Sequence, residues 1–182
     1  MLSIMVDDWE LRIQDGDLPS IFTAYLDHAD YVDKIDLDNP EGRFLFFGAL
    51  NRGQEDGWPS IISAQKYRDE RRTFTPGFLV VPNTSLVFVG AGERLLCYDV
   101  QNKTRLWEDE TTFGFWAWRR FDRYVLMSAE IEFGVWDQHG KKLWTVFVET
   151  PWGYEVKNDY VELNVMGTRT IYKLSDGAKV SE

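Results

Sequence analysis

Apolar residues in the C-terminal two thirds of the chain recur at an interval of 37 residues, and the first such set is Phe78, Phe115 and Trp152. Within each copy the apolar positions come in steps of two, the period of a β-strand, because successive side chains of a strand point to opposite faces. The recurrence defines six sets of three equivalent positions, and all eighteen are apolar although only 44% of the chain is hydrophobic. Repeats of this length indicate stacked units that share a continuous core. The other five columns are Val80, Ala117 and Tyr154; Val87, Tyr124 and Val161; Val89, Leu126 and Leu163; Tyr98, Val135 and Tyr172; and Leu106, Leu143 and Val180.

Turn-forming residues such as Pro82-Asn83, His139-Gly140 and Asp176-Gly177 divide each copy into four short apolar segments. Four strands in about forty residues is the dimension of one propeller blade. We therefore predict a mainly β fold, in which residues 70–182 form three four-stranded antiparallel blade-like repeats. The expected strands lie near 78–81, 85–89, 94–99 and 104–108, then 115–119, 123–128, 132–137 and 142–148, then 152–157, 160–165, 169–174 and 178–181.

The last hairpin of each copy carries a recurring motif, in which an aromatic residue and Asp lead through a turn to Lys and Trp. It resembles the outer-strand motif of quinoprotein-type β-propeller repeats over about twelve residues per copy, and WD-like repeats approach the same hairpin geometry. The resemblance implies a blade-like fold. Family members that bind the quinone cofactor close larger rings and add a metal-binding carboxylate set, which we do not find here, so we expect neither cofactor nor metal. The residues are Tyr98, Asp99, Lys103 and Trp107, then Trp136, Asp137, Lys141 and Trp144, with a weaker version at Tyr172, Gly177 and Lys179.

Residues 1–69 do not repeat the motif, and we expect them to form a β-rich segment that packs on the repeats as part of one structural domain. Strands are predicted at Trp9 to Gln14, Arg43 to Leu50 and Ile61 to Tyr67. Residues 20–37 fit a short amphipathic helix or a further β segment, and we favour the helix. The polar stretch Asn51 to Gly57 reads as the longest loop.

The outer face of the third copy carries Gly153, Glu155, Tyr160 and Glu162, whereas the corresponding face of the first copy is apolar. A solvated outer face is what the last unit of an open stack requires, because a closed ring buries both faces of every blade. We therefore expect an incomplete propeller or an open stack of sheets.

The charge balance narrows the classes of partner. The 182-residue chain has 20 Lys and Arg against 30 Asp and Glu, a formal charge of −10, and a pI of about 4.7. Such a surface repels nucleic acid and anionic lipid, so neither is expected as a partner. Cys97 is the only cysteine and cannot form an internal disulfide. With no apolar run of membrane-spanning length and no signal-peptide pattern at the start, we expect a cytoplasmic protein.

No residue pattern identifies a catalytic, cofactor or metal site. The two histidines, His28 and His139, belong to no His-x-x-x-His pair, and no nucleophile elbow, phosphate-binding glycine loop or paired-cysteine site is present. We therefore predict no catalytic residue, and an enzyme is less expected than a binding protein.

Aromatic and charged residues provide the candidates for binding. Trp118 and Trp152 fit stacking on sugar rings, with Arg120 and Glu155 beside them, although tryptophans within repeats usually serve packing. Trp58, at the end of the polar loop, is the tryptophan we most readily place on a binding surface.

Asp30 and Asp33 belong to a series of aspartates at every third residue, Asp27, Asp30, Asp33 and Asp36. On a helix, this spacing would place them along one flank, as a cation site, a docking face for a basic partner, or a solvated face.

Three functions remain open. The first is a non-catalytic interaction module for an unknown protein partner, for example a basic protein that this acidic chain neutralises. The second is a protein that binds or processes glycans through exposed Trp and carboxylates. The third is a structural protein that completes its sheet array as a homo-oligomer.

Overall fold

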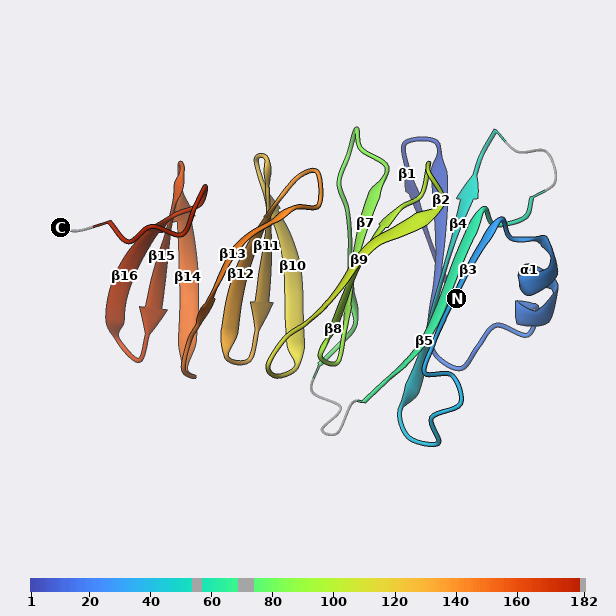
Figure 1. Cartoon of the computed structure of the whole chain (residues 1–182), viewed down its shortest axis with the longest axis horizontal. Coiled ribbons are helices and arrows are strands. Elements are labelled where there is room, and N and C mark those ends of the chain that lie inside the picture. Colours follow the sequence, from blue (N-terminus) through green and yellow to red (C-terminus); the bar gives the residue numbers. More distant parts are fainter. Residues whose placement is uncertain (54–56, 69–73, 181–182) are drawn as a thin grey trace.

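The protein is a row of four β-sheets standing side by side, with the sheet of the N-terminal segment at one end and the C-terminal sheet at the other (Figure 1). The computed structural model describes residues 1–53, 57–68 and 74–180. Along the row the sheets have five, four, four and three strands, and none closes on itself or on the sheet at the opposite end. The fold is therefore mainly β, with blade-like repeats in an open array, as the sequence predicts.

The three repeats are antiparallel meanders, in which each strand pairs with the next one along the chain. The first two have four strands each, in agreement with the prediction. The strands are β6 (Gly77–Val80), β7 (Leu86–Ala91), β8 (Arg94–Asp99) and β9 (Thr104–Glu110), then β10 (Phe115–Phe121), β11 (Tyr124–Ala129), β12 (Glu132–Asp137) and β13 (Lys142–Phe147), then β14 (Trp152–Lys157), β15 (Tyr160–Val165) and β16 (Thr168–Lys173).

The third repeat departs from the prediction of a fourth strand at 178–181. Only one isolated bridge, between Tyr172 and Lys179, occupies that place, supported by a hydrogen bond from the Val180 amide to the Ile171 carbonyl at 2.9 Å. Residue 181 lies outside the described residues. The described chain therefore gives the last sheet three full strands.

The N-terminal sheet contains the three predicted strands and two that were not predicted as such. Its order is β1-β2-β4-β5-β3, with β3 parallel to β5 and the other pairs antiparallel. The segment expected to be helix or strand is both in succession, a helix and then β3. Of the predicted loop Asn51 to Gly57, residues 54–56 lie outside the described residues. The elements are β1 (Leu2–Val6), β2 (Trp9–Gly16), α1 (Phe22–His28), β3 (Tyr31–Ile35), β4 (Arg43–Asn51) and β5 (Ile61–Tyr67).

The helix α1 covers the outer face of the five-stranded sheet (Figure 1). Tyr25 is buried on this face against Phe46, with ring centroids 5.8 Å apart, and its hydroxyl accepts a hydrogen bond from Arg12 at 3.0 Å. Ile62 completes this small apolar cluster. The first end of the row is thus closed by the chain itself.

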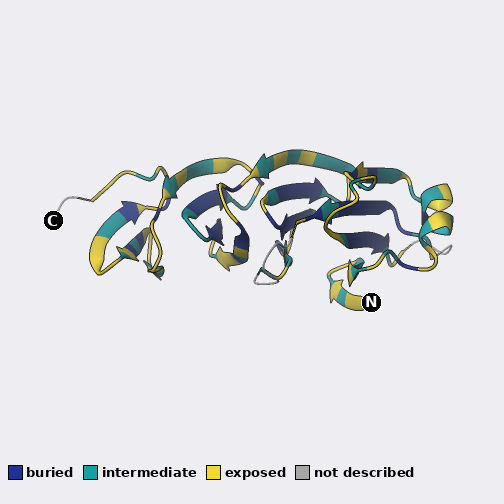
Figure 2. Ribbon diagram, turned by 90° about the horizontal axis from the view of Figure 1, so that it is seen from below, coloured by how far each residue is buried: buried dark blue, intermediate teal, exposed yellow. Residues whose placement is uncertain are grey.

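Hydrophobic clusters fill the spaces between neighbouring sheets, and the repeat columns supply much of them. The column Val89, Leu126 and Leu163 is at most 2% exposed. The column that ends the repeat is the exception, because Leu106 and Val180 are 43% and 37% exposed. Both lie in or beside the outermost strand of their copy, which has solvent on its free side. Figure 2 shows the buried strands concentrated in the first three sheets and exposed residues increasing toward the C-terminus.

Successive sheets are joined by a tryptophan that docks on the last hairpin of the next repeat. The indole Nε1–H of Trp107 donates to the carbonyl of Gly140 at 2.6 Å, and that of Trp144, 37 residues later, donates to the carbonyl of Leu174 at 2.9 Å. Their rings stack on Trp136 and Tyr172 respectively. A Cβ added at Gly177 would lie 2.8 Å from the Trp144 ring, which explains glycine in that turn. The repeated tryptophans therefore serve packing, as their spacing predicts.

The far end of the row presents a polar face to solvent. Exposed Glu155 pairs with Lys157 at 2.9 Å, and Glu162 pairs with Arg169 at 3.3 Å. This face is the solvated terminal surface that the sequence predicts for an open stack. No helix in the described part of the chain has the length and apolar character needed to cross a bilayer.

Candidate functional site

The aspartates spaced three residues apart do not share a helix flank, which corrects the sequence interpretation. The helix ends at His28, and Asp33 lies on β3. Asp30 pairs with Lys103 at 2.8 Å, and Asp33 pairs with Arg105 at 3.1 Å. These carboxylates therefore meet basic residues of the first repeat, and they join the N-terminal sheet to it.

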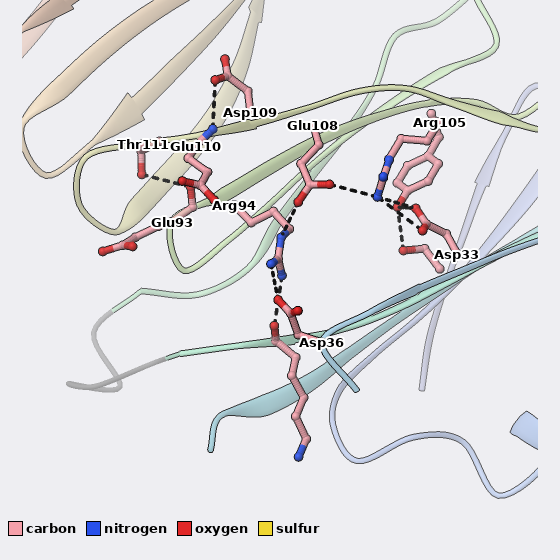
Figure 3. A network of polar contacts seen from close by, with 12 residues as sticks. Asp33, Asp36, Glu93, Arg94, Arg105, Glu108, Asp109, Glu110 and Thr111 are labelled. Atoms are coloured by element: carbon pink, nitrogen blue, oxygen red, sulfur yellow. Dashed lines mark hydrogen bonds and ion pairs between the residues drawn. The ribbon is translucent and has the colours of Figure 1, made fainter. Parts of the chain in front are cut away.

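The ion pairs continue as one network along this junction (Figure 3). Arg105 also contacts Glu108 at 3.2 Å, Glu108 accepts from Arg94 at 2.9 Å, and Arg94 reaches Asp36. The chain of charges thus runs from Asp33 to Asp36 through three side chains of the first repeat. Because each charged group has an internal counter-charge, this network does not offer a free docking face.

Asp33 is the buried end of the network, with 9% of its surface exposed. Its carboxylate accepts from the Tyr98 hydroxyl at 2.8 Å, and Tyr98 is also 2.8 Å from the Ser63 hydroxyl. Burial, together with the nearby Asp33 charge, raises the pKa of Tyr98 well above its ordinary value. The phenol therefore stays protonated as a hydrogen-bond donor.

Trp118 is a core residue, with 8% of its surface exposed. A β-bulge between Phe115 and Ala117 shifts the strand by one residue, so that Trp118 faces the same side as Phe115. Trp116 takes the opposite side and stacks on Trp152, with ring centroids 5.5 Å apart and planes at 12°. Trp116 therefore lies against the next sheet, and the bulge turns Trp118 away from it.

Trp58 packs beside α1. Its ring stacks on His28 at 4.1 Å and meets Tyr25 edge-on at 6.1 Å. It is half-buried among the residues that cover the outer face of the N-terminal sheet.

Trp152 and Glu155 lie on opposite faces of β14 and border the same open hollow. This hollow, of about 510 Å³, lies at the C-terminal sheet, and we call it the terminal hollow. Arg120 is exposed elsewhere, where its guanidinium donates to the carbonyl of Asp122 at 2.9 Å, and it is not part of this lining. One tryptophan ring and one tyrosine ring, which pack toward the neighbouring sheet, and two carboxylates on the outer face contribute to this lining. The lining consists of Pro151, Trp152, Gly153, Tyr154, Glu155, Glu162, Asn164, Met166, Gly167 and Arg169.

A second hollow, of about 430 Å³, lies where the N-terminal sheet, the first repeat and the second repeat meet, and we call it the acidic cavity. Its lining contains more carboxylates than cations and two phenylalanines. The lining consists of Asp36, Asn39, Glu41, Lys66, Tyr67, Arg68, Phe74, Ala91, Gly92, Glu93, Arg94, Glu110, Phe113, Gly114 and Glu130.

The acidic cavity could not be found from the sequence, because its lining residues come from five separate segments of the chain. Phe113, which is 51% exposed, was the only available signal, since it is an aromatic residue between two predicted strands. Glu93, Glu110 and Glu130 each stand at a turn or strand end and have no distinguishing spacing.

The described residues that line the two hollows form no recognisable catalytic arrangement. Among the described residues, no group of three or more His, Cys, Asp and Glu side chains is placed to hold a metal ion. Cys97 is fully buried, and burial together with the Asp99 charge raises the pKa of its thiol to about 12. A thiol of this kind is not a nucleophile at neutral pH.

Comparison with known proteins gives no family. No protein-family model matches the chain, and no curated protein matches it. Among solved structures, the computationally designed Ika4 protein aligns at 16% identity with a TM-score of 0.45, over 62% of this chain and 74% of that chain. BamB from Moraxella catarrhalis aligns at 13% identity with a TM-score of 0.45, over 75% of this chain and 42% of that one. Hsv2 from Kluyveromyces lactis aligns at 13% identity with a TM-score of 0.35, over 58% of this chain and 34% of that one.

Proposed function

We propose that this protein is a non-catalytic interaction module that binds a basic protein. The observation that supports this most directly is the formal charge of −10 on the molecule. The aspartates Asp30, Asp33 and Asp36 are engaged inside the chain, so the acidic excess falls on other carboxylates. A surface of one sign speeds encounter with a partner of the opposite sign and suppresses binding of partners with the same sign.

The architecture supports the same function. Each repeat is held to the next by a hydrophobic cluster and a docked tryptophan, so the surface of the repeats is preformed. Preformed surfaces lose less conformational entropy on binding than flexible ones. We also infer that the repeats are of the quinoprotein propeller type, used here as a scaffold without the cofactor. We further propose a cytoplasmic location, which the single, unpaired Cys97 supports.

The test is affinity capture followed by binding of the purified partner. The immobilised full chain is expected to retain a stoichiometric protein of basic pI from a native lysate. Because exposed charges are screened by salt, the affinity of that purified partner should fall as sodium chloride is raised from about 0.05 to about 0.5 M. Failure to retain any stoichiometric partner, or an affinity that salt does not change, contradicts the proposal.

One observation favours a second function, glycan binding. The terminal hollow combines Trp152 and Tyr154 with Glu155, Glu162 and Asn164, and aromatic rings beside hydrogen-bonding groups suit the two faces of a sugar. A glycan array should then give a selective signal, and titration of that glycan should change the tryptophan emission. If the emission change is lost in Trp152→Phe, the bound glycan contacts Trp152. An array without selective binding contradicts glycan binding.

A further inference from the structure

The acidic cavity is built on three chain segments that hydrogen bonds hold together. The Thr111 amide donates to the Glu93 carbonyl at 2.7 Å, and the Phe115 amide donates to the Gly92 carbonyl at 2.7 Å. The Glu130 amide donates to the Gly114 carbonyl at 3.1 Å. The β7–β8 turn, the β9–β10 connection and the β11–β12 turn therefore present their side chains in fixed relative positions.

Among the described residues that line this cavity, the acidic side chains outnumber the basic ones. Its three cations already have partners, since Arg94 contacts Asp36 and Glu108, Arg68 lies 3.7 Å from Glu41, and Lys66 donates to the carbonyl of Asn39. The carboxylates of the remaining acidic residues have no ion pair within the described chain. Figure 3 shows the Glu93 carboxylate directed away from the network of Arg94. Those unmatched residues are Glu93, Glu110 and Glu130.

An apolar surface accompanies these carboxylates. Phe113 is 51% exposed and lines the cavity with half-buried Phe74. Trp116, two residues beyond Gly114, is 39% exposed. Its stacking partner Trp152 donates its Nε1–H to the Glu130 carbonyl at 2.9 Å, which places both rings beside the same turn. Solvation of acidic side chains does not require exposed aromatic rings beside them, whereas a binding surface commonly contains both.

We propose that the acidic cavity docks a basic, partly apolar segment of a partner polypeptide. This inference rests on the proposed function and specifies where the partner binds and through which contacts. A Lys or Arg side chain of the partner lies among Glu93, Glu110 and Glu130, and its aliphatic stem packs on Phe113. Long basic side chains suit both parts of this surface, because their stems are apolar and their charged ends also favour the faces of aromatic rings. A site with central aromatic anchors and a charged rim has the usual anatomy of a protein interface.

The probe is a short fluorescent peptide in which lysines and arginines alternate with leucines, titrated against the full chain. The test variant is Glu93→Gln, Glu110→Gln, Glu130→Gln, and a second variant is Phe113→Ala. The matched control, Asp8→Asn, Asp122→Asn, Asp159→Asn, changes the net charge equally, at exposed turns on the opposite end of the sheets. Circular dichroism and thermal unfolding establish that each variant retains its fold.

We expect the glutamine variant to bind the peptide at least tenfold more weakly than wild type, and the asparagine control to bind within about twofold. Phe113→Ala should weaken the alternating peptide several-fold and leave the binding of an all-lysine peptide nearly unchanged. Zero-length carbodiimide cross-linking should join the lysines of the peptide to Glu93, Glu110 or Glu130, and not to Asp122 or Asp159.

The outcomes separate this inference from the proposed function. Equal weakening in the test and control variants, or cross-links at the opposite end, overturns the docking site while binding of a basic partner stands. Absence of peptide binding to wild type overturns the docking site, whereas the proposed function is overturned by failure to capture a basic protein or by a partner affinity that salt does not change. Glycan binding that Phe113→Ala or the glutamine variant abolishes would assign the cavity to the other class of ligand and likewise overturn the inference.

Discussion

At the scale of single residues, Asp99 illustrates how one carboxylate defines a turn of the repeat. Its Oδ1 accepts from the Ser85 hydroxyl at 2.6 Å and from the amides of Gln101 and Asn102 at 3.1 and 3.0 Å. Asp137 is the matching residue of the next copy, 38 residues later and so one residue more than the repeat interval. Its carboxylate accepts from the amides of His139 and Lys141 in the same way. The aromatic–Asp pair of the sequence motif is therefore a turn-closing device.

Asp99→Asn should destabilise the protein in a pH-dependent manner. Burial opposes ionisation of Asp99, but the hydrogen bonds from Ser85 and Asn102 outweigh it and hold its pKa below the ordinary value of 3.8. A lowered folded-state pKa means that the stabilisation is present above about pH 4 and is lost as the pH falls through the folded value. We expect a loss of about 1–2 kcal/mol at pH 7. Urea unfolding at several pH values should show the difference from wild type shrinking below about pH 4, and a constant difference would contradict this account.

Cys97 should not react with a thiol reagent in the native protein. With its pKa raised to about 12 by burial and the Asp99 charge, only a fraction on the order of 10⁻⁴ is thiolate at pH 8. We expect no reaction with Ellman's reagent over an hour at pH 8, and immediate reaction in concentrated urea. Rapid labelling of the folded chain would show that the first repeat opens locally.

At the scale of elements, the same hydrogen bond, from a tryptophan indole to the last hairpin of the following repeat, joins both pairs of neighbouring repeats. Trp144→Phe keeps the ring and removes the Nε1–H that donates to the Leu174 carbonyl, so it should cost about 1–2 kcal/mol. Trp144→Ala also removes the stack on Tyr172 and should cost about 3 kcal/mol or more. Trp116→Ala is the control, because it also removes a ring stack, on Trp152, but from a residue that is 39% exposed, and it should cost less than Trp144→Ala. Chemical denaturation would measure all three, and equal losses would refute a special role for the docked indole.

The elements also show what the sequence could and could not predict. The column Val89, Leu126 and Leu163 was predictable because burial imposes the same apolar residue type on each copy. The side taken by Trp118 was not predictable, because a one-residue bulge reverses the faces of a strand without a sequence signal in this copy. Likewise, the partners of Asp33 were hidden, since Arg105 lies 72 residues away and on another sheet.

At the scale of the whole molecule, each sheet touches only its neighbours, so stability should be local. Leu163→Ala removes a side chain that is 1% exposed in the last interface and should cost about 2–5 kcal/mol. Hydrogen exchange should show faster exchange in β14, β15 and β16 while β4 and β5 keep their protection. The matched change Leu96→Ala, in the interface between the N-terminal sheet and the first repeat, should loosen both of those sheets. Uniform loss of protection in Leu163→Ala would instead indicate one cooperative unit.

The candidate binding surfaces were less accessible to sequence reasoning than the fold. Trp152 and Glu155, three residues apart, lie on opposite faces of β14, so the alternation of the strand gave no reason to expect both at the terminal hollow. The acidic cavity depends on residues from Asp36 to Glu130 that meet only once three sheets are placed side by side. Local periodicity carries no information about that arrangement.

The docking of one indole on the turn of the following repeat has a consequence for engineering. Each middle unit offers an indole donor at one side, as Trp144 does, and an accepting turn at the other, as Gly140 does. A duplicated 37-residue segment inserted in frame would meet compatible surfaces before and after it, with α1 and the polar terminal face still closing the two ends. The number of repeats between the N-terminal sheet and the C-terminal sheet should therefore be adjustable in steps of 37 residues.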